Sequence, residues 1–234
     1  MYNGSERPHR MYFLGELFKR NLIDNNYITA FFDNNYLKNL PIDSYIHEFR
    51  DNLKELQQNY NKFPLRFQES DNRSNIQMWH LMENEFFHYN DARFGISSET
   101  KFFHTEQKCP REINERQHFC IACSTCYYND QIFITEKTYK LIAGKLPFII
   151  LGFTNTLQVL REAGYKTFYP YINESYDNIV SDYDRLQAIA KEVERLCNFT
   201  DSEWEIFAEN VLPIIKHNQE QLFKVKPKYI VLNG

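Results

Sequence analysis

The chain has 234 residues, of which 43% are hydrophobic and 25% are charged, and its formal net charge is −4. This composition is typical of a globular protein with one large or two small domains, and the negative charge excludes a protein that binds polyanions over its whole surface. The longest apolar run, near residues 146–153, is too short to span a bilayer, and the first residues lack the apolar core of a signal peptide, so we expect a cytoplasmic protein.

A polar loop opens the chain, and an apolar periodic helix follows it at about residues 11–21. The loop, residues 3–10, reads Asn-Gly-Ser-Glu-Arg-Pro-His-Arg. Guanidinium and imidazole groups of this kind can bind a phosphate or an acceptor. The alternative is a solvated chain start with incidental charge. The candidate side chains of this loop are Asn3, Arg7, His9 and Arg10.

The alternating residues 27–32 predict a strand, and Asp43 is expected to open a long helix that runs to about Lys62 with an apolar stripe. Residues 63–117 mix aromatic and polar side chains and contain several carboxylates. A carboxylate or an imidazole is the usual general base where a hydroxyl has to be deprotonated. By position alone the candidates are Glu83, Glu85 and His88, although a solvated helix face explains the two glutamates equally well.

Three cysteines, Cys120, Cys123 and Cys126, have a spacing that superficially resembles a metal ligand set. Residues 118–123, however, read as an inner strand, on which residues three apart point to opposite faces. Buried free cysteines also behave as small apolar residues. We therefore expect neither a metal nor a cofactor.

Residues 132–151 read as a helix followed by a buried strand. Thr135 is placed as the N-cap, Glu136 and Lys137 fall in the first turn, and Gly144 ends the helix. The uniformly apolar run from Leu146 to Leu151 favours a parallel strand covered on both faces. A helix start that carries a lysine suits an anionic ligand, and the alternative is a capped, solvated first turn.

Two further helix starts are predicted in the C-terminal part. Ser181 is expected to cap a helix that ends near Cys197, and Thr200 with Glu203 forms a capping-box pattern. The acidic pair Asp182 and Asp184 lies at the first of these starts, where capping explains it better than metal binding. The last helix is expected to kink or restart near Pro213.

These segments, in this order, resemble the donor-binding half of the fucosyltransferase-like glycosyltransferases and, within that group, uncharacterised viral and bacterial members. The resemblance rests on Phe133-Ile134-Thr135-Glu136-Lys137, on Lys145 to Ile150, on residues 160–168 (Leu-Arg-Glu-Ala-Gly-Tyr-Lys-Thr-Phe) and on residues 173–177 (Asn-Glu-Ser-Tyr-Asp). A weaker similarity to the same group lies in the N-terminal pattern of Asn3, Arg7, His9 and Arg10. A viral origin is compatible with it.

The resemblance implies an α/β fold with a Rossmann-like, GT-B-type donor lobe and a reduced N-terminal α/β lobe. It places residues 1–100 in an acceptor-side region and residues 101–234 in a nucleotide-sugar-binding domain with C-terminal helices. Lys137 is then expected on the donor phosphates and Glu136 on sugar or ribose hydroxyls. The full set of donor-binding residues that we assign is Ser124, Thr135, Glu136, Lys137 and Lys140.

The chain departs from the group's pattern in two places. The strand before the Thr-Glu-Lys helix usually ends in an acidic residue before Thr, and the aligned pair here is Ser124-Thr125. A hydroxyl cannot act as a general base unaided. The N-terminal pattern usually follows an upstream strand, whereas here only two residues precede it, which indicates a shortened protein or a part of a longer one.

The predicted function is metal-independent transfer of a sugar from a nucleoside diphosphate sugar to an acceptor hydroxyl. The acceptor is a glycan, a protein or a modified nucleic-acid base, and inversion at the sugar carbon is implied by the resemblance alone. Two alternatives remain: a non-catalytic module that binds nucleotides or phosphate, and a phage-type transferase that glycosylates DNA bases after unstacking them. The location is the cytoplasm, which is that of the host if the protein is viral.

Overall fold

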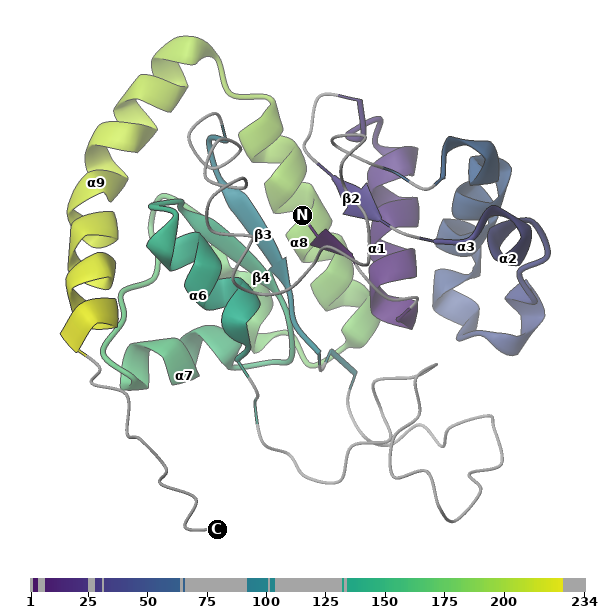
Figure 1. Ribbon diagram of the computed structural model, residues 1–234, viewed down its shortest axis with the longest axis horizontal. Helices are drawn as coiled ribbons and strands as arrows, with labels where there is room; N and C mark the ends of the chain where they lie inside the picture. Colours follow the sequence, from purple (N-terminus) through teal and green to yellow (C-terminus); the bar gives the residue numbers. More distant parts are fainter. Residues whose placement is uncertain are drawn as a thin grey trace, which may run out of the picture.

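The computed structural model describes residues 2–3, 7–24, 28–30, 32–63, 65, 92–100, 102–103, 132 and 134–224. Two pairs of parallel strands lie among helices (Figure 1). β1 (Tyr2–Asn3) pairs with β2 (Thr29–Ala30), and β3 (Gly95–Ser98) pairs with β4 (Phe148–Leu151). Parallel neighbours need a crossover connection, and α1 (Pro8–Lys19) lies in the connection between β1 and β2. The α/β class is therefore confirmed.

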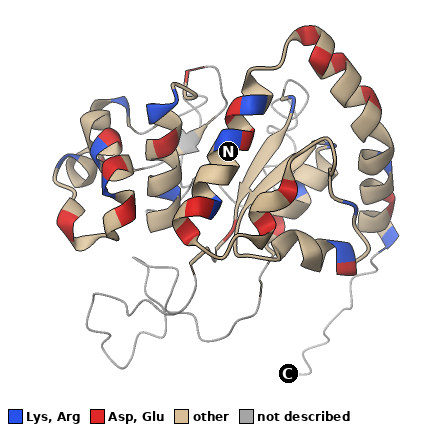
Figure 2. Ribbon diagram, turned by 180° about the vertical axis from the view of Figure 1, so that it is seen from behind, with Lys and Arg blue, Asp and Glu red and all other residues tan. Residues whose placement is uncertain are grey.

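The pair of β3 and β4 forms the centre of the C-terminal part of the fold. Its register places Ile96 opposite Ile149, and all four residues of β4 are buried. This confirms the parallel strand predicted from the apolar run. The two strands carry no charged residue, and the charged side chains lie on the surrounding helices and loops (Figure 2).

Helix α6 (Glu136–Ala143) packs directly on β3. A Cβ atom at Gly95 would lie 2.4 Å from Cδ2 of Leu141, so the strand can approach the helix only because Gly95 has no side chain. The helix has Thr135 as its N-cap and Gly144 as its C-cap, and both positions were predicted.

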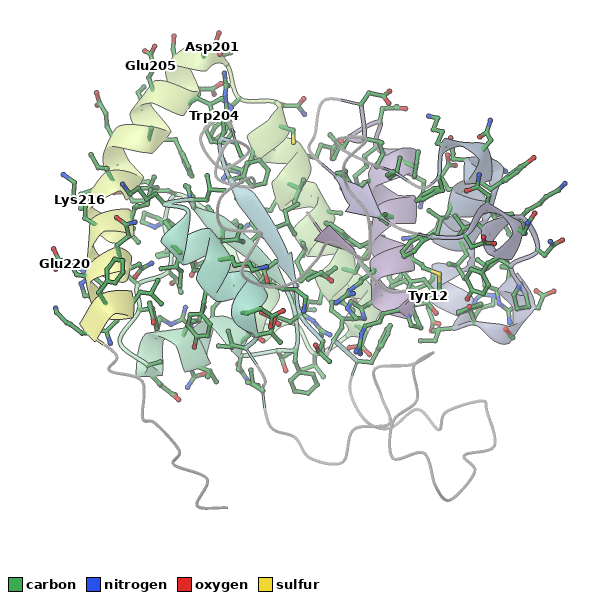
Figure 3. The ribbon with its side chains drawn as sticks, in the orientation of Figure 1. Tyr12, Asp201, Trp204, Glu205, Lys216 and Glu220 are labelled. Atoms are coloured by element: carbon green, nitrogen blue, oxygen red, sulfur yellow. The ribbon has the colours of Figure 1, made fainter. Side chains whose placement is uncertain are left out.

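The N-terminal part is built on α1 and α3 (Arg50–Gln58), which cross closely. Gly15 of α1 faces the backbone of Asn52, and the Asn52 side chain donates to the Tyr12 carbonyl at 2.9 Å. Tyr12 also stacks on Phe49 with a ring separation of 4.2 Å. In Figure 3, Tyr12 points from α1 toward α3.

The prediction of one helix from Asp43 to Lys62 is wrong, because the only α-helix in this segment, which the structure describes throughout, is the shorter α3. The segment contains three 3-10 turns, η1 (Ile42–Ser44), η2 (His47–Phe49) and η3 (Tyr60–Lys62), around α3, and it follows a short helix, α2 (Asn34–Lys38). Arg50 donates to the carbonyls of Asp43 and Tyr45. These bonds hold the chain before α3 in turns in place of a continuous helix.

Helix α8 (Asp182–Cys197) joins the two parts of the fold. The carboxylate of Glu16 on α1 accepts from Arg20 at 2.8 Å and from Gln187 of α8 at 3.0 Å, and Arg20 also pairs with Glu194 of α8. Because Glu16 is only 3% exposed, the bonds to its carboxylate are shielded from solvent, and they hold α1 against α8.

The predicted N-caps of the last two helices, α8 and α9 (Asp201–Lys224), are confirmed. Ser181 accepts from the Asp184 amide, and Thr200 and Glu203 make the reciprocal bonds of a capping box at the start of α9. Helix α9 continues through Pro213 as one element, so the predicted restart is not found.

Helix α9 runs along the outer side of α6 (Figure 1). At its start Trp204 points inward and stacks on Phe94, 6.0 Å between ring centres, while Lys216 and Glu220 point outward (Figure 3). Nearer its end, Asn218 bonds both the amide and the carbonyl of Lys166. The helix thus holds the loop that follows α7 (Thr156–Glu162).

Within the described residues, no helix is both long and apolar enough to cross a membrane. The predicted division at residue 100 stays a prediction. β3, which lies just before that residue, pairs with β4 beyond it.

Candidate functional site

Two helices begin beside the residues that follow β3. Helix α6 starts after Thr135, whose amide donates to the Glu99 carboxylate at 3.1 Å, and α1 starts after Arg7, whose guanidinium donates to the Thr100 carbonyl at 3.2 Å. Both starts face the edge where β3 and β4 end (Figure 1). The positive ends of two helix dipoles therefore converge at the carboxyl edge of a parallel sheet, a frequent place for ligands in α/β folds.

The first turn of α6 is organised by Thr135. Its hydroxyl oxygen accepts from the Lys137 amide at 3.4 Å, as expected of an N-cap, and from the Lys137 ammonium at 3.2 Å. Thr135 is buried, whereas Lys137 is half-buried and Glu136 is exposed. The cap therefore holds Lys137 beside the helix start and leaves Glu136 in solvent.

Glu99, which the sequence analysis missed, is the buried carboxylate of this site. It is 1% exposed, and its oxygens accept from the Thr135 hydroxyl at 2.6 Å, the Thr138 hydroxyl at 2.6 Å and the Ser97 hydroxyl at 3.3 Å, in addition to the Thr135 amide. A buried carboxylate needs such a set of donors. Glu99 therefore fixes the start of α6 on the end of β3.

The sequence did contain a signal for Glu99. The strand that pairs with β4 is followed directly by Glu99-Thr100, which is an acidic residue followed by Thr. The resemblance places this pattern at Ser124-Thr125, so it gave no reason to select Glu99. Ser124 lies outside the described residues, so its predicted role in donor binding stays a prediction.

Arg7, His9 and Arg10 of the N-terminal pattern donate hydrogen bonds to the backbone at the end of β3. Three successive carbonyls accept bonds from three side chains: Ser98 from Arg10 at 3.3 Å, Glu99 from His9 at 3.0 Å, and Thr100 from Arg7 at 3.2 Å. Arg10 also donates to the Ser98 hydroxyl at 3.2 Å. These side chains thus have a structural task that the sequence did not reveal, since their partners are about 90 residues away.

His9 is completely buried and stacks on Phe102, with ring centres 5.5 Å apart and planes 13° apart. Burial, followed by the charges of Arg10 and Arg7, holds the pKa of His9 well below its ordinary value of 6.5. The imidazole is therefore neutral at pH 7. Because the Glu99 carbonyl can only accept, the ring nitrogen Nε2 carries the proton.

Lys137 lies in an environment that disfavours its charge. Burial and then the neighbouring Arg10 lower the pKa of Lys137, Glu99 and Glu136 oppose this effect, and Arg7 lowers it further. Three cations therefore share this place with two carboxylates, one of which is in solvent. An anion that bound here would relieve the repulsion between the cations.

The start of α7, beside the end of β4, offers a contrast. Its first amides, those of Leu157 and Gln158, donate to the Asp177 carboxylate at 3.0 and 3.3 Å. Glu174 is also buried and accepts from the amides of Phe168 and Tyr169. The segment 173–177, which is part of the resemblance, therefore has a structural role. The Asp177 carboxylate occupies the start of α7, where an external anion would otherwise bind.

The other predicted residues are placed only in part. Lys140 is half-buried, one turn further along α6 than Glu136 and Lys137, and Asn3 lies in β1, where only its backbone is described. The predicted catalytic residues and the cysteine cluster lie outside the described residues: Glu83, Glu85, His88, Cys120, Cys123 and Cys126. In the described part of the chain, no three His, Cys, Asp or Glu side chains are grouped to hold a metal ion.

Comparisons of the chain with family models, with curated proteins and with solved structures find no match. The interpretation of this site therefore depends on its residues and their geometry.

Proposed function

We propose that the protein is a glycosyltransferase that moves a sugar from a nucleoside diphosphate sugar to an acceptor hydroxyl, with residues from about 101 onward forming a Rossmann-like, GT-B-type donor lobe. One observation carries the proposal: Lys137 at the start of α6 and Arg7 at the start of α1 lie beside the residues that follow a buried parallel pair, where Thr135 bonds Glu99 and Arg7 bonds the Thr100 carbonyl. A diphosphate is the anion that suits this combination of ammonium, guanidinium and helix dipole.

The proposed roles follow from the positions. The Lys137 ammonium contacts a phosphate oxygen, because it is the half-buried cation next to the helix start. Arg7, also half-buried, adds charge from the α1 side, whereas Arg10 is 4% exposed and acts mainly through its field. Glu136, exposed in the same first turn, is placed to accept from sugar or ribose hydroxyls.

The chemistry that this site supports is departure of the diphosphate. The bond between the sugar carbon and the phosphate oxygen breaks, the diphosphate keeps the electron pair, and the acceptor oxygen forms the new bond while a base takes its proton. Cations and a helix dipole held in place before the reaction stabilise the charge that develops on the leaving oxygen, without reorganisation. Glu83, Glu85 and His88 remain the proposed bases.

Glu99 supports the proposal in a second way. An acidic residue before Thr usually ends a strand in the fucosyltransferase-like group; the resemblance aligns that position with Ser124-Thr125, and we propose that Glu99-Thr100, directly after β3, takes its place. Its carboxylate is engaged with Thr135 and Thr138, so we assign it to building the helix start and not to proton transfer.

The alternative is a module that binds nucleoside diphosphates without turning them over. It is favoured by the use of Arg7, His9 and Arg10 on backbone carbonyls of residues 98–100, which is a structural role. Both functions need the same anion site, and turnover separates them.

Thermal-shift and calorimetric titrations with GDP, UDP, ADP and CMP test the proposal, followed by transfer assays with the corresponding nucleotide sugars over a panel of glycans, proteins and modified DNA. We expect one nucleoside diphosphate to raise the melting temperature, and Lys137→Ala to abolish the shift. Lys191→Ala, on an exposed part of α8, is the control.

Binding without transfer to any acceptor would favour the module. A shift that survives Lys137→Ala would remove Lys137 from the site, and the absence of any shift in the parent protein would overturn the proposal.

A further inference from the structure

Arg185 is a buried arginine in the first turn of α8. It is 1% exposed, and its guanidinium donates to the carbonyls of Gly152 at 3.2 Å, Ile179 at 2.9 Å and Val180 at 3.2 Å, and also to that of Phe102. Its ion-pair partner is Asp182 at 2.6 Å. One side chain therefore satisfies four backbone carbonyls, which a planar group with five N–H donors can do and an ammonium cannot.

The four carbonyls belong to three separate segments. Gly152 follows β4, Phe102 follows β3 at a short distance, and residues 179–180 precede α8. Arg185 thus holds three segments together at the carboxyl edge of β3 and β4. The proposed anion site lies at the same edge.

The aromatic ring of Phe102 connects Arg185 to that site. The Arg185 carbon Cζ lies 4.4 Å from the centre of the Phe102 ring, and the same ring stacks on the His9 imidazole at 5.5 Å. Phe103 meets both rings edge-on, at 5.2 Å from Phe102 and 6.1 Å from His9. The guanidinium and the imidazole therefore both pack against the Phe102 ring, and we refer to these three groups as the column.

We propose that Arg185 is a positioning residue of the anion site, and that it sets the orientation of the His9 imidazole through the ring of Phe102. His9 Nε2 donates to the Glu99 backbone carbonyl, and the Glu99 carboxylate accepts from the amide and the hydroxyl of Thr135, the N-cap of α6. A tilted imidazole would release the end of β3 and, with it, the turn that carries Lys137. This inference rests on the proposed function for the identity of the anion. The contacts within the column do not depend on that function.

The contrasting explanation is that Arg185 only satisfies backbone carbonyls and stabilises the fold. Two variants separate the explanations. Phe102→Leu removes the ring but keeps the carbonyl that Arg185 bonds, and Arg185→Lys keeps the charge but loses the planar group. Arg195→Lys is the matched control, because Arg195 lies on the same helix, pairs with Glu192 and lies 4.9 Å from the Phe199 ring.

The readouts are the tautomer and the titration midpoint of His9, from ¹⁵N long-range NMR spectra assigned with His9→Gln, and the affinity for inorganic pyrophosphate. We expect Phe102→Leu and Arg185→Lys to mix the two tautomers, to move the midpoint toward the ordinary value, and to weaken pyrophosphate binding by at least about tenfold. Arg195→Lys should leave all three unchanged.

If Phe102→Leu lowers the melting temperature but retains the Nε2–H tautomer, the midpoint and an affinity within about twofold, the column serves stability alone and the inference is overturned. If Arg185→Lys does not fold, Phe102→Leu decides the matter. If the parent protein fails to bind pyrophosphate, the proposed function fails, while the His9 spectra still decide whether Arg185 positions the imidazole.

Discussion

The Glu99 carboxylate accepts hydrogen bonds from both the backbone amide and the hydroxyl of Thr135, at 3.1 and 2.6 Å. Glu99 is the residue directly after β3, and Thr135 is the residue directly before α6. The Thr135 hydroxyl oxygen in turn accepts from Lys137. The end of the strand therefore determines where the ammonium of the proposed anion site lies.

Glu99→Gln should destabilise the protein by about 1–3 kcal/mol, because the amide would turn an N–H group toward donors and leave a buried hydrogen bond unmade. Urea denaturation measures the loss. Glu162→Gln is the control, since Glu162 is exposed and, within the described part of the chain, its carboxylate accepts from Gln158. Equal effects of the two substitutions would show that the Glu99 cluster has no special role.

Lys137→Met should leave the melting temperature of the unliganded protein unchanged or higher. The substitution keeps the aliphatic length and removes an ammonium that burial and Arg10 disfavour. The same variant should weaken the binding of a diphosphate by at least about tenfold, because a bond to a charged group is lost. Calorimetry and thermal unfolding test both parts, and a large fall in stability would show that the ammonium stabilises the unliganded fold, contrary to this prediction.

His9 should make the stability depend on pH. Because the pKa of His9 is lowered in the folded state, the unfolded chain binds the extra proton, so stability is complete above about pH 6.5 and falls as the pH decreases below it. The slope approaches about 1.4 kcal/mol per pH unit for one proton. Urea denaturation from pH 7.5 to pH 5.5 should show this slope in the parent but not in His9→Gln; parallel curves would refute it.

Gly15→Ala should destabilise the protein, although alanine is favoured over glycine within a helix by about 1 kcal/mol. The new Cβ atom would lie 1.9 Å from the Asn52 carbonyl oxygen, so α1 and α3 would have to separate. We expect a net loss of about 1–3 kcal/mol. Thermal unfolding gives the sign directly, because a rise in melting temperature would show that the two helices can move apart freely.

The predictions that the structure confirms depend on short stretches of sequence. The caps at Thr135, Ser181 and Thr200 and the end of a helix at Gly144 involve residues no more than a few positions apart. The buried strand at residues 148–151 is recognisable because a strand covered on both faces must be apolar throughout. Such features are readable from the chain because the interacting groups are neighbours along it.

The predictions that were missed or wrong depend on distant partners. Glu99 was not selected, since its donors Thr135 and Thr138 are 36 and 39 residues away. The ligand role of Arg7, His9 and Arg10 stays a prediction, whereas their bonds to the end of β3 were missed because those partners are 88 to 93 residues away. The helix expected at residues 43–62 is divided where Arg50 bonds carbonyls that a continuous helix would use itself.

Local chemistry in the chain was thus enough to locate a capped helix start that carries a lysine next to a buried parallel strand. Which charges surround that lysine could be learned only from the folded chain. Pairing of β3 with β4 brings Glu99 beside the start of α6, and α1 and α8 then supply His9 and Arg185. The physical reason is that burial and electrostatic fields depend on distance in space, whereas periodicity and capping depend on distance along the chain.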